Sequence, residues 1–326
     1  MNRSFAIALV FTCACGSSND PPTFDVVLDH LPGAVLSFWG QSTDDLFAVG
    51  GDLGDPGEEL ILHYDGATWS RMQADAPTLW WVHGFGPDDV WAVGEHGTIV
   101  HYDGSGWTTV HSSNDYTLWG IWGAAPDDLW AVGGSVTHAV PSIVLHYDGS
   151  TWSEVSELAR DGDMYFKIWG SSASDIWTVS EKGFAVHYDG STWTAVDSGA
   201  GTRLITVTGR AADDVYAVGG VTSSVLLHYD GSDWQPIDVD LSGGLMGVWA
   251  GPDQQLFVTG FSGIMALSDG EQWTPLPFVT PDCLHATWGD GNGVILGGGG
   301  NLVSASGGDG VIVGTGDIAG GPVTGL

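Results

Sequence analysis

The chain has 326 residues and is strongly acidic, with 40 Asp and Glu against only seven Lys and Arg and a formal net charge of −33. Such a surface repels nucleic acid and anionic lipid headgroups, which excludes nucleic acid as a partner. Apolar residues make up 43% of the chain, with 51 Gly and 17 Trp, a composition that favours an all-β repeat protein over a disordered chain.

The first 15 residues, MNRSFAIALVFTCAC, are predicted to be a signal peptide outside the folded domain. Arg3 gives a basic start, and the apolar run of residues 5–11 is too short to remain as a membrane span. Residues 12–15 (TCAC) resemble a bacterial lipobox, with Thr in place of the usual leucine. The resemblance implies export, lipidation of Cys15 and a place in the bacterial cell envelope. Gly16 after the cysteine implies sorting to the outer membrane, with the lipid as the only membrane contact.

After a linker at residues 16–23, one phrase recurs seven times between residues 24 and 306. The clearest copy, residues 118–155, contains a run ending in Trp-Gly, an Asp turn, Trp-Ala-Val-Gly, a variable loop, His-Tyr-Asp-Gly and a final Trp. The ends of the first runs, 39–47 residues apart, are Gly40, Gly84, Gly123, Gly170, Gly209, Ala250 and Gly289. Each copy reads as four short strands, and repeats of this length predict the blades of a propeller. We therefore expect a single seven-bladed β-propeller with four antiparallel strands per blade.

The ring has two candidates for its last outer strand. Elsewhere the aromatic that opens an outer strand lies 15–18 residues before the next Trp-Gly anchor, and Phe24 lies 16 residues before Gly40. Residues 24–28 are therefore predicted to complete the last blade, which removes an open sheet edge. Residues 311–313 (VIV) are the alternative. Residues 307–326 are interpreted as a Gly-rich tail outside the propeller.

Residues 91–107 (WAVGEHGTIVHYDGSGW) carry a phrase that recurs through most of the chain. It resembles the Asp-box, or BNR, repeats of sialidase-type propellers, in particular the lipoprotein-like propellers related to the photosystem II assembly factor. A standard Asp box places Asp and Trp five residues apart, whereas Asp103 and Trp107 are four apart here. The resemblance implies the propeller fold, and fold alone does not assign a function.

A His-Tyr-Asp-Gly phrase recurs in five of the seven copies. The five histidines that precede Tyr-Asp-Gly are His63, His101, His146, His187 and His228. Because one copy per blade distributes them around a ring, we interpret them as structural, and we assign no metal ligand. The paired Asp residues of the turns leave Ca²⁺ as a possible cofactor, since carboxylates suit hard cations.

The loops differ between the two faces of the ring. Turns between strands one and two, and those of His-Tyr-Asp-Gly, are nearly copies of one another, whereas the loops on the other face vary in length and content. Variable loops on a rigid scaffold commonly bind ligands. The candidate contacts on that face are Trp80, Trp119, Arg160, Lys182 and Arg203. Trp80 and Trp119 occupy equivalent positions, where they could pack between blades or form aromatic platforms at the mouth of the ring.

These features favour a non-enzymatic, exported, monomeric scaffold that binds a protein or glycan through its variable face. No catalytic residue is assigned. A sialidase-like glycoside hydrolase is the first alternative, and it requires Arg71, Arg160 and Arg203 to converge near a Glu and a Tyr. A multivalent lectin is the second, and it requires similar aromatics in equivalent loops. The lone Cys283 is interpreted as incidental.

Overall fold

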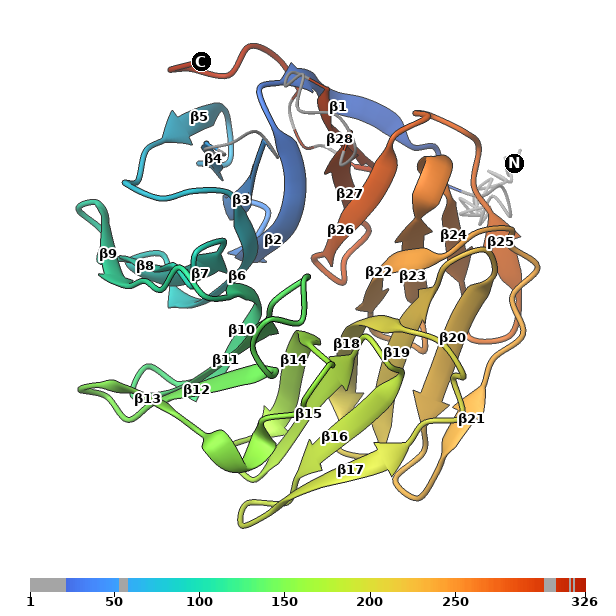
Figure 1. The fold of residues 1–326 in the computed structure, drawn as a ribbon. Helices are drawn as coiled ribbons and strands as arrows, with labels where there is room; N and C mark the ends of the chain where they lie inside the picture. The colour runs from blue at the N-terminus through green and yellow to red at the C-terminus, as the bar shows by residue number, and fades with distance from the viewer. Residues whose placement is uncertain (1–21, 53–57, 302–308, 317, 319) are drawn as a thin grey trace, which may run out of the picture.

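A computed structural model describes residues 22–52, 58–301, 309–316, 318 and 320–326, so the predicted signal peptide and Cys15 lie outside the described residues. In this part of the chain, 28 strands form seven four-stranded antiparallel sheets arranged as a ring (Figure 1). The protein is therefore the predicted seven-bladed β-propeller. Two short 3-10 segments, η1 (Ser156–Leu158) and η2 (Phe261–Gly263), lie in its loops.

Each blade contributes one strand to each of four concentric positions. The innermost strands are β2 (Ala34–Ser42), β6 (Leu79–Gly86), β10 (Thr117–Ala125), β14 (Tyr165–Ser172), β18 (Leu204–Ala211), β22 (Leu245–Ala250) and β26 (Cys283–Gly289). The second strands are β3 (Asp45–Gly51), β7 (Asp89–Gly94), β11 (Asp128–Gly134), β15 (Asp175–Ser180), β19 (Asp214–Gly220), β23 (Leu256–Gly260) and β27 (Ile295–Gly300). The third strands are β4 (Glu59–Tyr64), β8 (Ile99–Tyr102), β12 (Ile143–Tyr147), β16 (Phe184–Tyr188), β20 (Ser224–Tyr229), β24 (Met265–Ser268) and β28 (Gly310–Gly314). The outer strands are β5 (Trp69–Met72), β9 (Trp107–His111), β13 (Trp152–Glu154), β17 (Trp193–Asp197), β21 (Trp234–Pro236), β25 (Trp273–Pro275) and β1 (Asp25–Leu31).

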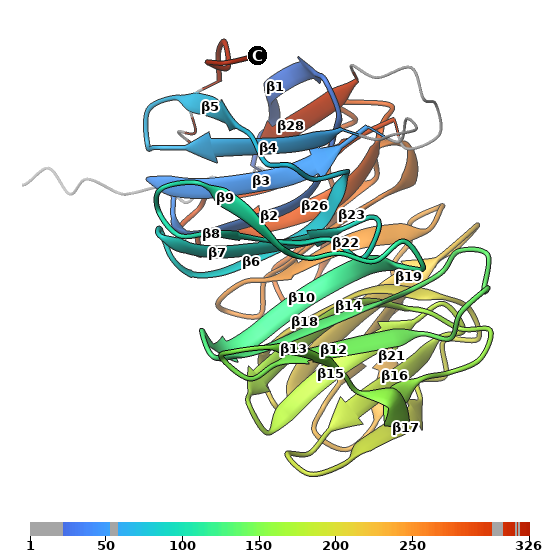
Figure 2. The same ribbon diagram turned by 60° about the vertical axis from the view of Figure 1, so that its left-hand side comes forward.

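Blades 1 to 6 follow chain order from β2, and blade 7 consists of β26, β27, β28 and the N-terminal strand β1. Figure 2 shows β1 beside β28, and Val26 pairs with Val313 in their antiparallel ladder. Phe24 also takes the place of an outer-strand aromatic, because its ring stacks on Phe257 of blade 6 at 5.3 Å between centroids. The predicted closure of the ring by residues 24–28 is confirmed.

The alternative for the outer strand, residues 311–313, belongs to β28, the third strand of blade 7. Both candidate strands are therefore used, and the predicted propeller boundary at residue 306 is wrong. The difference has a local reason: β28 lacks the His-Tyr-Asp-Gly phrase that marks the third strands of blades 1 to 5. The third strand that the sequence suggests before residue 306 falls largely on residues 302–308, outside the described residues.

The C-terminal residues also contact the ring. The Arg71 backbone N–H donates to the Thr324 carbonyl at 2.8 Å, and the Thr324 N–H donates to the Trp69 carbonyl at 3.0 Å. Figure 1 places the C-terminus beside β5, and Ile318 is buried in the core cluster between blades 7 and 1. Within residues 307–326, predicted as a tail outside the propeller, Gly310–Gly314 therefore form a third strand, Ile318 packs between blades 7 and 1, and Thr324 is hydrogen-bonded to β5.

Aromatic side chains fill the space between neighbouring blades. Trp177 on the second strand of blade 4 lies 4.7 Å from Tyr229 and 5.3 Å from Trp234 of blade 5, measured between ring centroids. Phe47, Trp91 and Trp130 make the equivalent contact with the outer-strand Trp of the next blade. Each contributes about 0.5–1.5 kcal/mol beyond the area it buries. The repeated Trp residues are thus explained by blade packing.

Every inner strand contains a β-bulge near its first residues. In blade 3, Leu118 pairs with Gly133 and Gly120 with Val132, so Trp119 has no partner opposite it. The residue that falls at this register shift in each blade is Leu36, Trp80, Trp119, Phe166, Ile205, Met246 or His285. In blade 4 the shift spans Phe166 and Lys167. A bulge redirects the extra side chain, and here seven bulges turn seven side chains toward the axis.

In six of the seven blades, a glycine on the second strand lies opposite the start of the bulged inner strand. A Cβ added to Gly133 would collide with the Thr117 carbonyl oxygen, and one added to Gly94 would collide with that of Thr78. The same collision with the start of the inner strand occurs at Gly50, Gly219, Gly260 and Gly299. Blade 4 has Ser180 at this position. The close approach of the two backbones therefore requires glycine in six of the seven blades.

Replacing Gly133 with Ala should destabilise the protein by about 2–3 kcal/mol, because the new methyl group forces the inner strand of blade 3 outward. Thermal and denaturant unfolding would measure the loss. Gly106→Ala is the matched control, since a Cβ there meets nothing within 4 Å. Equal stability of the two variants would show that the bulge tolerates a side chain.

Candidate functional site

The seven bulge residues meet at the axis, close to the variable-loop face. Inner strands begin on the face where the connections between blades arrive, and all seven bulges lie within the first three residues of their strands. Ring centroids are 4.5 Å apart for Trp80 and Trp119, 6.0 Å for Trp119 and Phe166, and 5.8 Å for Trp80 and His285. The equivalent positions thus form one aromatic and aliphatic wall.

This wall surrounds a cavity of about 180 Å³, the axial cavity. It is lined by Trp80, Trp119, Phe166, Lys167, Arg203, Ile205, Met246, Phe261 and His285. Trp80 and Trp119 are 8% and 9% exposed, so they are walls of a cavity and not open platforms on the rim. The sequence left open whether Trp80 and Trp119 pack between blades or face a ligand. In the structure they do both, since they are buried and also line the cavity.

Lys167 also lines this cavity, although the sequence analysis assigned no role to it. It follows the bulge residue of blade 4, and its side chain is buried. Its Nζ donates to the carbonyl oxygens of Trp119 at 2.5 Å and Trp80 at 3.3 Å, and lies 4.2 Å from the centroid of the Trp81 ring. Burial holds the pKa of Lys167 well below its usual range. One amine thereby joins blades 2, 3 and 4 beside the cavity.

Arg203 brings a second cation to the cavity from the connection before β18. Its Nε donates to the Gly220 carbonyl at 3.2 Å, and its Cζ lies 5.9 Å from the centroid of the Phe261 ring. The side chain is half-buried, and among the described residues it forms no ion pair with a carboxylate. Of the predicted contacts, Trp80, Trp119 and Arg203 are brought together here.

His285 closes the cavity from blade 7. It is 3% exposed, and its Nδ1 donates to the Leu36 carbonyl at 2.9 Å across the junction of blades 7 and 1. Burial, reinforced by the nearby Lys167, lowers the pKa of His285 to about 3. The imidazole is therefore neutral in the folded protein at neutral pH.

The neutral His285 should make stability fall on acidification. The unfolded histidine titrates near pH 6.5 and the folded one near pH 3, so between these values the unfolded state binds more protons and folding is disfavoured as the pH drops. Lowering the pH from 7 to 4 should cost on the order of 3 kcal/mol from this residue. Urea unfolding of wild type and of His285→Gln checks this, because the variant should lose that much less. Parallel pH profiles would contradict it.

Arg160 and Lys182 lie elsewhere, on the connection between blades 3 and 4 and on the loop of blade 4. Arg160 Nε is 3.5 Å from the buried carboxylate of Asp163, and its Cζ stacks 4.3 Å from the centroid of the Phe184 ring. The Lys182 side chain is exposed. These two cations belong to the rim of the variable face and do not line the axial cavity.

The three arginines of the hydrolase alternative have separate surroundings. Arg71 lies on the outer strand β5, where its Nη2 donates to the Glu59 carbonyl at 3.1 Å. Arg160 pairs with Asp163, and only Arg203 lines the axial cavity. Nothing in the described residues brings the three to a common carboxylate site.

The recurrent histidines each pair with an aspartate of their own blade. His63 Nε2 lies 2.6 Å from Asp45 Oδ1, and the pairs in four further blades are 2.6–2.9 Å long. The same imidazoles stack on second-strand aromatics, as His101 does on Trp91 at 4.0 Å. This arrangement accounts for the five histidines as structural residues, as predicted.

The aspartates of the His-Tyr-Asp-Gly turns bind their own turns. Asp148 Oδ1 accepts hydrogen bonds from the backbone N–H groups of Ser150 and Thr151, both at 2.9 Å. Hydrogen bonds from the Ser150 hydroxyl and from those N–H groups lower the pKa of Asp148 to about 2. Among the described residues, no group of three or more His, Cys, Asp or Glu is placed to hold a metal ion, and Ca²⁺ stays a prediction.

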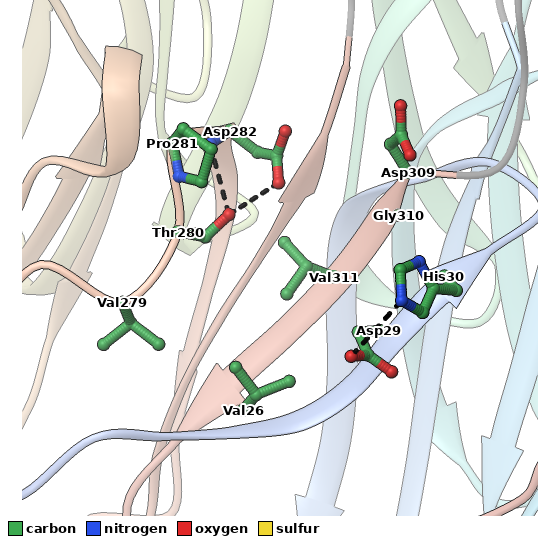
Figure 3. A pocket seen from close by; sticks show the side chains of 10 residues that line it. All are labelled: Val26, Asp29, His30, Val279, Thr280, Pro281, Asp282, Asp309, Gly310 and Val311. Atoms are coloured by element: carbon green, nitrogen blue, oxygen red, sulfur yellow. Dashed lines mark hydrogen bonds and ion pairs between the residues drawn. The ribbon is translucent and has the colours of Figure 1, made fainter.

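A larger groove of about 400 Å³ lies at the closure of the ring, between β1, β28 and the connection before β26 (Figure 3). Asp29, Asp282 and Asp309 lie around it, and Figure 3 shows Asp282 turned toward Thr280, whose hydroxyl it binds at 2.5 Å. His30 is 3.8 Å from Asp29, and both are exposed. These carboxylates are separated around an open rim and form no common site.

Among the described residues, Cys283 is a free thiol, at the start of β26. Burial raises its pKa to about 12, so the thiol stays protonated at neutral pH and is a poor nucleophile. Among the described residues, no helix has the length and apolar character needed to cross a membrane.

Comparisons with known proteins agree on the fold. No family model matches the chain, and no curated protein matches it. Among solved structures, YCF48 from Cyanidioschyzon merolae has a TM-score of 0.66 at 14% identity, with 90% of this chain and 98% of that one covered. YCF48 bound to D1 peptide has a TM-score of 0.67 at 13% identity, with 91% and 97% covered. The extracellular domain of a putative hybrid two component system, BT3049 from B. thetaiotaomicron, has a TM-score of 0.66 at 13% identity, with 92% and 42% covered. At these identities the likeness establishes the propeller and nothing finer.

Proposed function

We propose that this protein is a non-enzymatic scaffold that binds a protein partner on its variable-loop face, centred on the axial cavity. The main support for this proposal is that structurally equivalent positions on that face carry different side chains. Seven equivalent bulges there present Leu, two Trp, Phe, Ile, Met and His, with Arg203 in the cavity and Lys182 on the rim. Aromatic and Arg side chains are enriched among residues that dominate binding energy.

Two further observations support a protein partner. One structural neighbour, YCF48, is bound to a D1 peptide, so a propeller of this shape can serve as a peptide receptor. The axial side chains also converge on one shared cavity, which fits a single binding site better than the repeated sites of a multivalent lectin.

Charge reversal at Lys182 and Arg203 should abolish capture of the partner. The bait would be wild type, the double variant Lys182→Glu/Arg203→Glu, and Glu271→Lys, whose change lies on the opposite face. After crosslinking in envelope extract, the same proteins should be recovered with wild type and Glu271→Lys and lost with the double variant. Thermal unfolding would first confirm that all three are folded.

The capture experiment can also contradict the proposal. An identical set of proteins with all three baits would remove the variable face from the interaction. Capture that survives protease treatment of the extract but not periodate oxidation would replace the protein partner by a glycan.

We further propose that the protein is exported and held at the outer membrane by a lipid on Cys15. A single acyl chain binds a bilayer only weakly, so stable anchoring requires the several chains of a lipoprotein. Replacing Cys15 with Ser should move the protein from the membrane pellet to the supernatant after cell lysis, and mass spectrometry of the wild type should find a lipidated Cys15. Retention of Cys15→Ser in the pellet would place the anchor elsewhere.

A further inference from the structure

The axial cavity differs in charge from the rest of the molecule. The chain has 40 Asp and Glu and only seven Lys and Arg, yet the nine residues that line the cavity include Lys167 and Arg203 and no acidic residue. Both cations lack a carboxylate partner among the described residues. The cavity is thus a largely apolar compartment that contains two basic side chains and no carboxylate, inside an acidic protein.

We propose that the axial cavity binds a small organic anion, a carboxylate whose apolar body is about the size of a benzene ring. The site would be occupied by the free small molecule, and its occupancy does not depend on the protein partner proposed above.

The volume and walls of the cavity set the size and shape of this ligand. An apolar cavity of about 150 Å³ accommodates benzene, and the axial cavity measures about 180 Å³. Trp80, Trp119 and Phe166 are already spaced 4.5–6.0 Å apart between ring centroids. A ligand ring placed against them would continue this series, since aromatic rings prefer centroid distances of about 4.5–7 Å. Met246 and Ile205 line the remainder with apolar surface.

Arg203 supplies the group that would recognise the carboxylate. Its Nε donates a hydrogen bond to the Gly220 carbonyl oxygen. Among the described residues, no hydrogen bond involves Nη1 or Nη2 of Arg203. A guanidinium with free terminal nitrogens suits a carboxylate, because it can donate two parallel hydrogen bonds. The Phe261 ring lies beside the guanidinium, with its centroid 5.9 Å from Cζ, and apolar surroundings of this kind strengthen the attraction between charges.

Lys167 adds to the preference for an anion. Its Nζ is fixed by two backbone carbonyl oxygens and by the Trp81 ring, so it is present without reorganisation when a ligand enters. An anion nearby stabilises the ammonium form of a buried lysine, so the bound carboxylate and the charged amine favour each other.

The test uses the purified protein and phenylacetate as the probe. Titration calorimetry should show saturable one-to-one binding of phenylacetate. Phenylacetamide, which keeps the ring and loses the charge, should bind at least about tenfold more weakly, as should acetate, which lacks the ring. Phenethylamine, with the charge reversed, should not bind. No binding of phenylacetate at millimolar concentration, or equal binding of phenylacetamide, would overturn the proposal.

Variants then locate the site. Arg203→Gln should weaken phenylacetate binding at least about tenfold, whereas Arg160→Gln, a change of the same kind outside the cavity, should leave it unchanged. Ile205→Phe, which fills the cavity and keeps both cations, should also abolish binding and serves if Arg203→Gln does not fold. Unchanged binding in Arg203→Gln, or in a folded Ile205→Phe, would overturn the assignment. Because no partner protein is present, failure here is distinct from failure of the scaffold proposal.

Discussion

The centre of this propeller depends on a contact between two backbones. Near the start of each inner strand one extra residue is inserted, and in six blades a glycine on the second strand lets the inner strand approach more closely than any side chain would permit. The bulge turns the extra side chain to the axis. Without this contact Trp119 would take a regular place in its sheet, and the axial cavity would lose its walls. The close approach of the two backbones thereby determines which seven side chains point to the axis of the propeller.

The same backbone arrangement is repeated, but the chemistry it presents is not. Six of the seven axial positions are apolar or aromatic, and His285 is the exception, held neutral by its burial. Lys167 reaches the axis because the register shift in blade 4 includes it. On the opposite face, the aspartates of the turns satisfy backbone N–H groups and histidines, so much of the negative charge has a structural purpose. The face with the repeated turns therefore carries structural aspartates, whereas the variable-loop face carries Arg203 and Lys167 at the cavity.

Much of the fold could be predicted because the repeat is visible in single residues. The nearly constant spacing between the outer-strand aromatic and the Trp-Gly anchor identified Phe24 as the start of a strand, and Phe24 packs on the next blade as the other outer-strand aromatics do. The third strand of blade 7 was misplaced because Gly310–Gly314 lacks the His-Tyr-Asp-Gly phrase of blades 1 to 5. At the site, alignment of the repeats placed Trp80 and Trp119 in equivalent positions, but only the register shift shows that they face the axis. Lys167 gives no signal in sequence, since its role depends on carbonyl groups of two other blades.

The way the ring closes also has a consequence for how the chain folds. Strand β1 is made before the other described strands, but its partner β28 lies almost 290 residues later, since Asp25 pairs with Gly314. The outermost ladder of blade 7 therefore cannot form until β28 has been made. Pairings between distant segments are slow to form, because the loop between them must first be closed. Until then the hydrogen-bonding edge of β1 has no native neighbour, and such an edge can pair with other chains. Strand β1, which precedes all other described strands in the chain, therefore cannot take its native place in the ring until its C-terminal partner is available.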